Sequence, residues 1–278
     1  MAYATREDGT KIYYEEHGEG FPLVLVIGLG GTSSAWKLQV PEFSKKYRVI
    51  TLDNRGAGKS DKPDEPYSTA IFADDLKAVL DDAGIQKAAV LGLSMGGLIV
   101  QEFYHRYPEY VVAMVLGCTG VGTGDPEHVY PEQYVLDVLT MPKDHPNQEE
   151  MHRKKAGIFY HPNYIASIPN FMQHYIETIK KNDQPAYAYQ RQLDACILQK
   201  PELWNSPRLK KIKVPVYVVH GDDDQIWPLA TGQYLADNIP DAEFHIMPGA
   251  AHMMFIEMPD DFNAAVLSFL ERRLPANL

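Results

Sequence analysis

Residues 88–97 read AAVLGLSMGG and are followed at 98–107 by LIVQEFYHRY, so a serine stands between an apolar run and a helical pattern. A strand that turns directly into a helix leaves little room, and side chains at Gly92 and Gly96 would collide with their neighbours. We expect Ser94 to adopt a strained backbone conformation that lifts its hydroxyl clear of the sheet edge. Its place at a helix N-terminus favours negative charge nearby. The stretch therefore predicts a nucleophilic serine, the alternative being a glycine-rich turn without chemistry.

The rest of the chain alternates between apolar strand patterns and helical patterns. The predicted strands cover 11–16, 23–27, 49–52, 88–91, 111–116, 214–219 and 243–247. Ser68 or Thr69 can cap a helix that runs to about Asp82, and a last helix is expected over 259–273. Such alternation predicts the α/β class, with a mostly parallel central sheet and helices on both faces.

One region interrupts this alternation. Between Gly120 and about Lys213 the strand signal stops, and helical patterns rich in tyrosine and proline replace it. A helical insertion between two strands is most simply a lid over the strand ends, where open α/β sheets bind ligands. We therefore expect a core domain formed by residues 1–120 and 214–278, and a helical cap formed by residues 121–213.

Bulk composition excludes several functional classes. The net charge is −11 and no cluster of lysine and arginine stands out, which argues against nucleic acid or an anionic membrane as partner. Cys118 and Cys196 lie in apolar surroundings without metal-type spacing, which favours reduced thiols and a reducing compartment. The N-terminus has no apolar signal region and no stretch is long enough to span a bilayer, so we expect a cytoplasmic protein. The oligomeric state is left open by the sequence.

Five segments in the expected order resemble the α/β-hydrolase superfamily, in the branch with an inserted helical cap. They are LVLVIGLGGTSSAW (23–36), LDNRGAGKSDKP (52–63), LGLSMGG (91–97), HGDDDQIWP (220–228) and PGAAHMMFIEMPDDF (248–262). The resemblance covers essentially the whole chain, and it implies the α/β-hydrolase fold and a serine nucleophile elbow. Many family members carry a histidine before the first glycine of the 28–31 loop, where this chain has Ile27. That histidine lies outside the catalytic triad, so catalysis is not endangered.

A serine hydroxyl needs a general base, and the base needs a carboxylate that orients it. In this fold the chain order is serine, acid, histidine. His252 is the one histidine of ten that lies in a loop of small residues after a strand and after the acid. The resembled motif places the acid at Asp224. Because Asp222, Asp223 and Asp224 are consecutive, Asp223 remains the alternative.

The glycine-rich segment 28–31 supplies a further expectation. Its G-x-G-G spacing does not fit a dinucleotide fingerprint. The backbone N–H groups of Leu29 and Met95 are instead the expected oxyanion hole, because charge builds on the carbonyl oxygen only in the transition state. No set of potential ligand residues has the spacing of a metal site, so we expect neither a metal nor a cofactor.

These features predict a serine hydrolase that cleaves a small carboxylic ester or lactone through an acyl-enzyme, since a cap would exclude polymers. The pattern resembles carboxylesterases and 3-oxoadipate enol-lactonases. Two alternatives remain open: hydrolysis of a carbon–carbon bond in a dienoate ring-cleavage product, and a ligand sensor that retains the triad without turnover. The sequence does not identify the substrate-binding residues.

Overall fold

The computed structural model describes residues 2–182 and 184–274, and one eight-stranded sheet runs through them in the order β1-β2-β4-β3-β5-β6-β7-β8. The strands are β1 (Ala2–Thr5), β2 (Lys11–His17), β3 (Phe21–Val26), β4 (Tyr47–Leu52), β5 (Ala88–Leu93), β6 (Val111–Gly117), β7 (Val216–Gly221) and β8 (Ala242–Met247). Only the β1–β2 and β2–β4 pairs are antiparallel. The predicted mostly parallel α/β architecture is confirmed.

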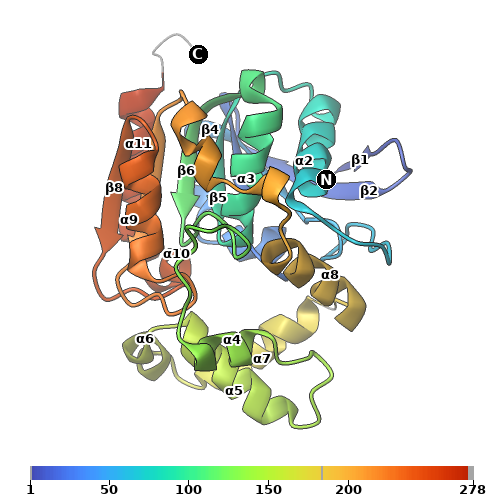
Figure 1. Ribbon diagram of the computed structural model, residues 1–278, viewed down its shortest axis with the longest axis vertical. Helices are drawn as coiled ribbons and strands as arrows, with labels where there is room; N and C mark the ends of the chain where they lie inside the picture. The colour runs from blue at the N-terminus through green and yellow to red at the C-terminus, as the bar shows by residue number, and fades with distance from the viewer. Residues whose placement is uncertain (1, 183, 275–278) are drawn as a thin grey trace.

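Helices cover both faces of this sheet (Figure 1). The strands' two faces bury two separate apolar clusters, since successive side chains of a strand point to opposite sides. One cluster contains side chains of α2 (Thr69–Asp82), α3 (Met95–Arg106) and α9 (Leu229–Asn238). The other contains side chains of α1 (Val40–Phe43), α10 (Met254–Glu257) and α11 (Pro259–Arg273).

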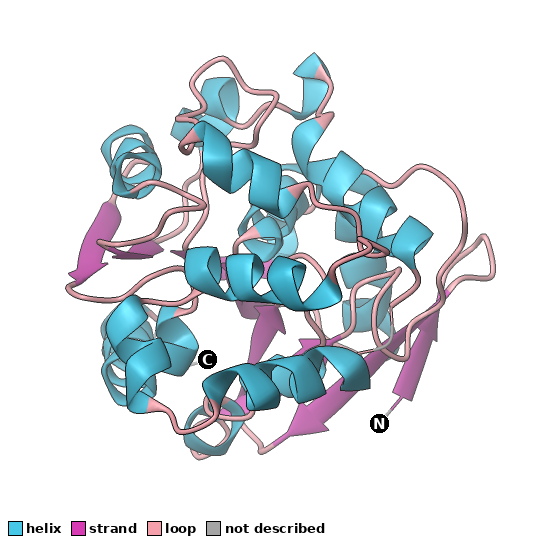
Figure 2. Cartoon of the chain, turned by 90° about the horizontal axis from the view of Figure 1, so that it is seen from below, coloured by secondary structure: helices cyan, strands magenta, loops and turns pink. Residues whose placement is uncertain are grey.

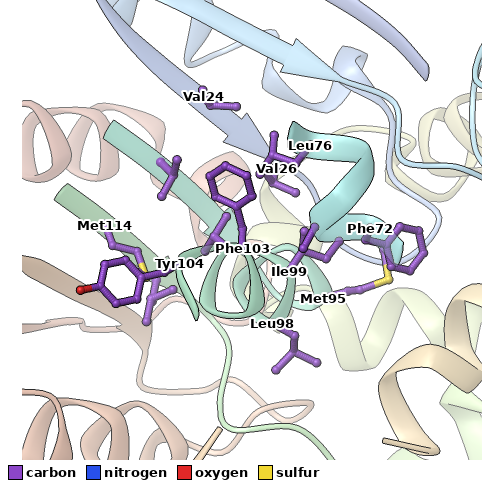
Figure 3. Close-up of a cluster of buried hydrophobic side chains, with 14 of the residues drawn as sticks. Val24, Val26, Phe72, Leu76, Met95, Leu98, Ile99, Phe103, Tyr104 and Met114 are labelled. Carbon is purple, nitrogen blue, oxygen red and sulfur yellow. The ribbon is translucent and has the colours of Figure 1, made fainter. Parts of the chain in front are cut away.

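Strand β5 is buried along its whole length because it contributes to both clusters. Val90 packs in the first cluster, whereas Leu91 and Leu93 pack in the second. Figure 3 shows the first cluster around α3, where Met95, Leu98, Ile99 and Phe103 pack with side chains of α2 and β3. The serine that follows β5 therefore stands between a fully buried strand and a helix that is buried over most of its length.

Between β6 and β7 the chain forms a helical segment that lies over the carboxyl ends of the parallel strands. Its elements are α4 (Gln133–Leu139), α5 (Gln148–Phe159), α6 (Pro162–Ser167), α7 (Phe171–Lys181), α8 (Ala186–Ile197), η3 (Pro201–Leu203) and η4 (Ser206–Lys211). In Figure 1, α4 to α7 form a layer below the sheet, and α8 lies between that layer and the core. Figure 2 looks onto this helical side from below.

The last part of the segment returns to the core. Leu209 and Ile212 are fully buried and belong to the same apolar cluster as α2 and α3. Among the described residues, no helix is both long and apolar enough to cross a bilayer.

Candidate active site

Ser94 sits in the turn between β5 and α3 with φ 55° and ψ −123°, a conformation that non-glycine residues rarely adopt. Its backbone is held on both sides. The Ser94 N–H donates to the Gly117 carbonyl at 3.0 Å, and the Thr119 hydroxyl donates to the Ser94 carbonyl at 2.8 Å. Strain of this kind persists only where the surroundings enforce it, and here the end of strand β6 and the segment that follows it do so.

The glycines around Ser94 are required by close backbone approach, as the sequence predicted. A Cβ at Gly92 would lie 2.3 Å from the Gly96 carbonyl oxygen, and a Cβ at Gly96 would lie 2.1 Å from that of Val26. Neither neighbour can give way, because both atoms belong to the backbone. The turn is therefore as tight as the strand-to-helix geometry demands.

His252 and Asp224 lie together, both buried, on the loops that follow β8 and β7. The His252 Nδ1 is 2.9 Å from Asp224 Oδ2 and 3.2 Å from Oδ1. The Asp224 carboxylate also accepts hydrogen bonds from the N–H groups of Ile226 at 2.9 Å and Trp227 at 3.0 Å. These donors fix the carboxylate, which in turn orients the ring so that Nε2 points away from it.

The two aspartates beside Asp224 face elsewhere. Asp222 is exposed and accepts a hydrogen bond from the Gly249 N–H at 2.7 Å. Asp223 is half-buried and lies 3.8 Å from His161 Nε2. The structure thus places Asp224, rather than the alternative Asp223, against the imidazole of His252.

A second imidazole, that of His220, also lies beside Asp224. His220 Nε2 is 2.6 Å from the Trp227 carbonyl and 3.5 Å from Asp224 Oδ2. Burial lowers the pKa of His220, so the ring is neutral near pH 7, and the carbonyl contact assigns its proton to Nε2. His220 therefore supports the turn that carries Asp224.

The loop of residues 27–31, here called the Gly28 loop, lies directly against Ser94. A Cβ at Gly28 would be 2.9 Å from the Ser94 Cβ. The Asn54 side chain donates to the Ile27 carbonyl at 2.8 Å, so the departure at Ile27 leaves this loop anchored through its backbone. Met95 begins α3, where the first N–H groups have no acceptor within the helix. The Gly28 loop, which contains Leu29, and the start of α3, which is Met95, thus both adjoin the serine.

A glutamine pair from the helical segment holds the Gly28 loop, and sequence reasoning did not find it. Gln192 of α8 is fully buried; its Oε1 accepts from the Gly30 N–H at 2.9 Å, and its Nε2 donates to the Arg55 carbonyl at 2.8 Å. Gln184 donates to the Gly56 carbonyl at 2.8 Å and to Gln192 Oε1 at 3.1 Å. No sequence motif marks these glutamines, because their partners are backbone atoms far away in the chain.

The end of α5 is joined to the loop that carries His252. The Met253 N–H donates to the Phe159 carbonyl at 3.1 Å, and the Phe159 and His252 rings meet edge to face with centroids 5.4 Å apart. The Glu257 carboxylate accepts from the N–H groups of Ala251 at 3.2 Å and His161 at 3.3 Å. The helical segment and the loop that carries His252 are therefore joined by hydrogen bonds and by a ring contact.

Among the described residues, one group has the makeup of a metal site. Cys118, Asp224 and His252 place one sulfur, oxygen or nitrogen atom each within 4.8 Å of one another. Burial, and secondly the charge of Asp224, raise the pKa of the Cys118 thiol well above its ordinary value. A neutral thiol is a weak ligand, because the thiolate is the form that binds metals. The carboxylate–imidazole contact accounts for the other two members.

Comparisons with known proteins agree with this geometry. The family model described as the alpha/beta hydrolase fold matches residues 22–259. The chain is 28% identical to the 3-oxoadipate enol-lactonase 2 of Acinetobacter baylyi, over 90% of this chain and 88% of that protein. It is 33% identical to a 2-hydroxy-6-oxononadienedioate/2-hydroxy-6-oxononatrienedioate hydrolase of Burkholderia vietnamiensis, over 96% and 93%. The crystal structure of the enol-lactonase from Burkholderia xenovorans LB400 superposes with a TM-score of 0.82 at 27% identity, over 97% of this chain and 100% of that one.

Proposed function

From the premise that this chain belongs to the α/β-hydrolase family, we propose that it is a serine hydrolase of small carboxylic esters or lactones. The relatives identify the chain as a hydrolase, and the arrangement of the site is our reason for proposing that the bond it cleaves is an ester or lactone bond. The observation that carries the proposal is the strained Ser94, placed beside the Gly28 loop, in a chain that also buries a His252–Asp224 pair.

In the proposed reaction, Ser94 Oγ attacks the substrate carbonyl while His252 Nε2 takes the hydroxyl proton. Asp224 keeps the remaining proton on Nδ1 and stabilises the imidazolium. The carbonyl π electrons move onto oxygen, where the N–H groups of Leu29 and Met95 stabilise the negative charge.

Collapse of the tetrahedral intermediate breaks the bond to the leaving oxygen, which receives its proton from His252. In a lactone that oxygen stays tethered to the acyl group. Water then repeats the sequence: His252 removes its proton, the hydroxide oxygen adds to the acyl carbon, and Ser94 leaves with the proton returned. The cycle consumes one water and restores the enzyme.

In this proposal residues 121–213 act as a cap over a core made of residues 1–120 and 214–278. Two hydrogen bonds support this assignment. One joins α8 to the Gly28 loop and the other joins α5 to the His252 loop, so the segment is attached to the core on two sides of the proposed site. A roofed site suits a small-molecule substrate rather than a polymer.

Carbon–carbon bond hydrolysis is the second candidate. It is favoured by the 33% identity to the Burkholderia vietnamiensis hydrolase, whose name describes dienedioate substrates. A ligand sensor that retains the triad would differ from both enzymes by stalling after about one equivalent of substrate.

The test is a panel of p-nitrophenyl esters, lactones and a dienoate ring-cleavage product, assayed with wild type and Ser94→Ala. We expect many turnovers on an ester or lactone, labelling by a fluorophosphonate at Ser94, and loss of both in the variant. Wild-type activity in Ser94→Ala would refute the mechanism. Turnover confined to the dienoate would favour the second candidate, and a single turnover would favour the sensor.

A further inference from the structure

Lys155 is a buried cation in α5, with a residue exposure of only 9%. Its Nζ donates to the Met141 carbonyl at 3.3 Å and stands 4.9 Å from the centre of the Tyr189 ring. Within residues 2–182 and 184–274, no carboxylate lies within ion-pair distance of this ammonium. The adjacent Lys154, by contrast, is exposed and pairs with Glu150 at 2.7 Å.

Two contacts place Lys155 beside the active site. Phe159 lies four residues further along α5, hence on the same helix face, and its ring contacts the His252 ring. The rise between positions 155 and 159 is about 6 Å. On the other side, the Tyr189 ring under Lys155 borders the Gly28 loop, since a Cβ at Gly30 would be 3.5 Å from its Cδ2. Lys155 is therefore linked to the His252 loop through Phe159 and to the Gly28 loop through Tyr189.

Among the residues that the structure describes, the groups around Lys155 do not neutralise its charge. Burial, and secondly the charge of Lys143, lower the pKa of Lys155 to about 8. Burial lowers the pKa of His152 on the same helix, so that ring is neutral near pH 7, and burial raises the pKa of Tyr189, so its phenol is also neutral. A buried ammonium is costly unless an anion completes its surroundings.

We propose that Lys155 forms a carboxylate subsite of the active site, so that the preferred substrate is an ester or lactone whose acyl part carries a second, anionic carboxylate. This inference rests on the proposed function. The ammonium would bind the distal carboxylate while the reacting carbonyl lies between Ser94 and the Gly28 loop. Positions 155 and 159 are about one helical turn apart, so a ligand that extends from His252 past Phe159 to Lys155 needs an acyl chain of a few carbons.

The experiment compares two p-nitrophenyl esters of similar length, the monoglutarate with its terminal carboxylate and the neutral valerate. Lys155→Met removes the charge and keeps the length, Lys155→Arg keeps a charge, and Lys154→Met is the control on the exposed face. We expect the ratio of kcat/KM for glutarate over valerate to fall at least tenfold in Lys155→Met, through KM. Lys155→Arg should retain most of the preference, and Lys154→Met should match wild type.

An unchanged ratio in Lys155→Met, or an equal loss in Lys154→Met, would overturn the subsite. A readout without turnover separates this failure from failure of the proposed function. Free glutarate should raise the Tm of wild type and of Ser94→Ala, but not of Lys155→Met. If neither ester is hydrolysed while this Tm pattern holds, the reaction is wrong and the subsite stands. If esters are hydrolysed and glutarate shifts no Tm, the subsite is wrong and the reaction stands.

Discussion

Gln192 Oε1 accepts a hydrogen bond from the Gly30 N–H at 2.9 Å, which ties helix α8 to the loop beside Ser94. The same amide donates to the Arg55 carbonyl, so one buried side chain spans two loops of the core. Because the proposed oxyanion donor Leu29 precedes Gly30, any rotation of this amide moves the donor. The helical segment thus contributes to positioning the groups that would stabilise the transition state.

Gln192→Leu should therefore lower kcat more than it raises KM. Loss of a donor itself costs roughly 10²–10³ in rate, so a displaced donor should cost about tenfold or somewhat more. The affinity for a trifluoromethyl ketone, which mimics the tetrahedral intermediate, should fall in parallel with kcat/KM. Gln190→Leu is the matched control, because Gln190 is exposed on the same helix and bonds only to Asp194 among the described residues. A change in KM alone, or the same loss in both variants, would show that Gln192 merely shapes the pocket.

Asp224→Asn should reduce kcat by roughly 10⁴, by analogy with the serine-protease triad, because an amide leaves the imidazole in the wrong tautomer. Asp223→Asn should cost far less, since that half-buried carboxylate contacts His161 and not His252. Asp222→Asn should act mainly on stability, through the bond to the Gly249 N–H. Steady-state kinetics on the preferred ester check all three, and a reversed order for Asp223 and Asp224 would move the acid by one position.

Much of this fold could be predicted from the chain because its signals are local. The capped helix Thr69–Asp82, with the Ser68 side chain accepting from the Ile71 N–H, follows from a polar cap and one apolar face. The final helix Pro259–Arg273 likewise has the predicted bounds. Strand β1 gave no signal, because it is a four-residue edge strand, AYAT, with only one buried position. Helix α9 was not anticipated either, and it packs on β7 and β8 through only a few buried positions.

The residues of the site also differ in whether a local sequence signal predicts them. Ser94, His252 and Asp224 stand in recognisable segments, so their spacing predicts which chemistry they carry. Gln192, Lys155 and Phe159 carry no local signal, because their partners are a backbone N–H, an aromatic ring and an imidazole that are distant in sequence. Only the packing of α5 and α8 onto the core reveals them.

We expect alanine substitutions at Gly157 and at Gly84 to change stability in opposite directions, although both positions have open space where a Cβ would lie. Gly157→Ala, inside α5, should stabilise the fold by about 0.5–1 kcal/mol, because alanine restricts the unfolded chain and favours the helix. Gly84→Ala should destabilise it by about 1–2 kcal/mol, because Gly84 has φ 67°. Urea unfolding of both variants measures the difference. Equal effects would mean that backbone conformation does not set the cost at these positions.

The pH dependence of KM gives a separate test of the charge on Lys155. Its pKa is lowered to about 8, so the ammonium is present below that pH and lost above it. The carboxylate of the monoglutarate ester stays ionised over this range, because an ordinary carboxyl titrates near pH 4. The ratio of KM for glutarate over valerate should therefore be flat between pH 6 and 7 and rise above pH 8, after correction for spontaneous hydrolysis. In Lys155→Arg the rise should disappear, because a guanidinium stays charged throughout. The same rise in wild type and Lys155→Arg would assign it to another group and remove Lys155 from the recognition of the anion.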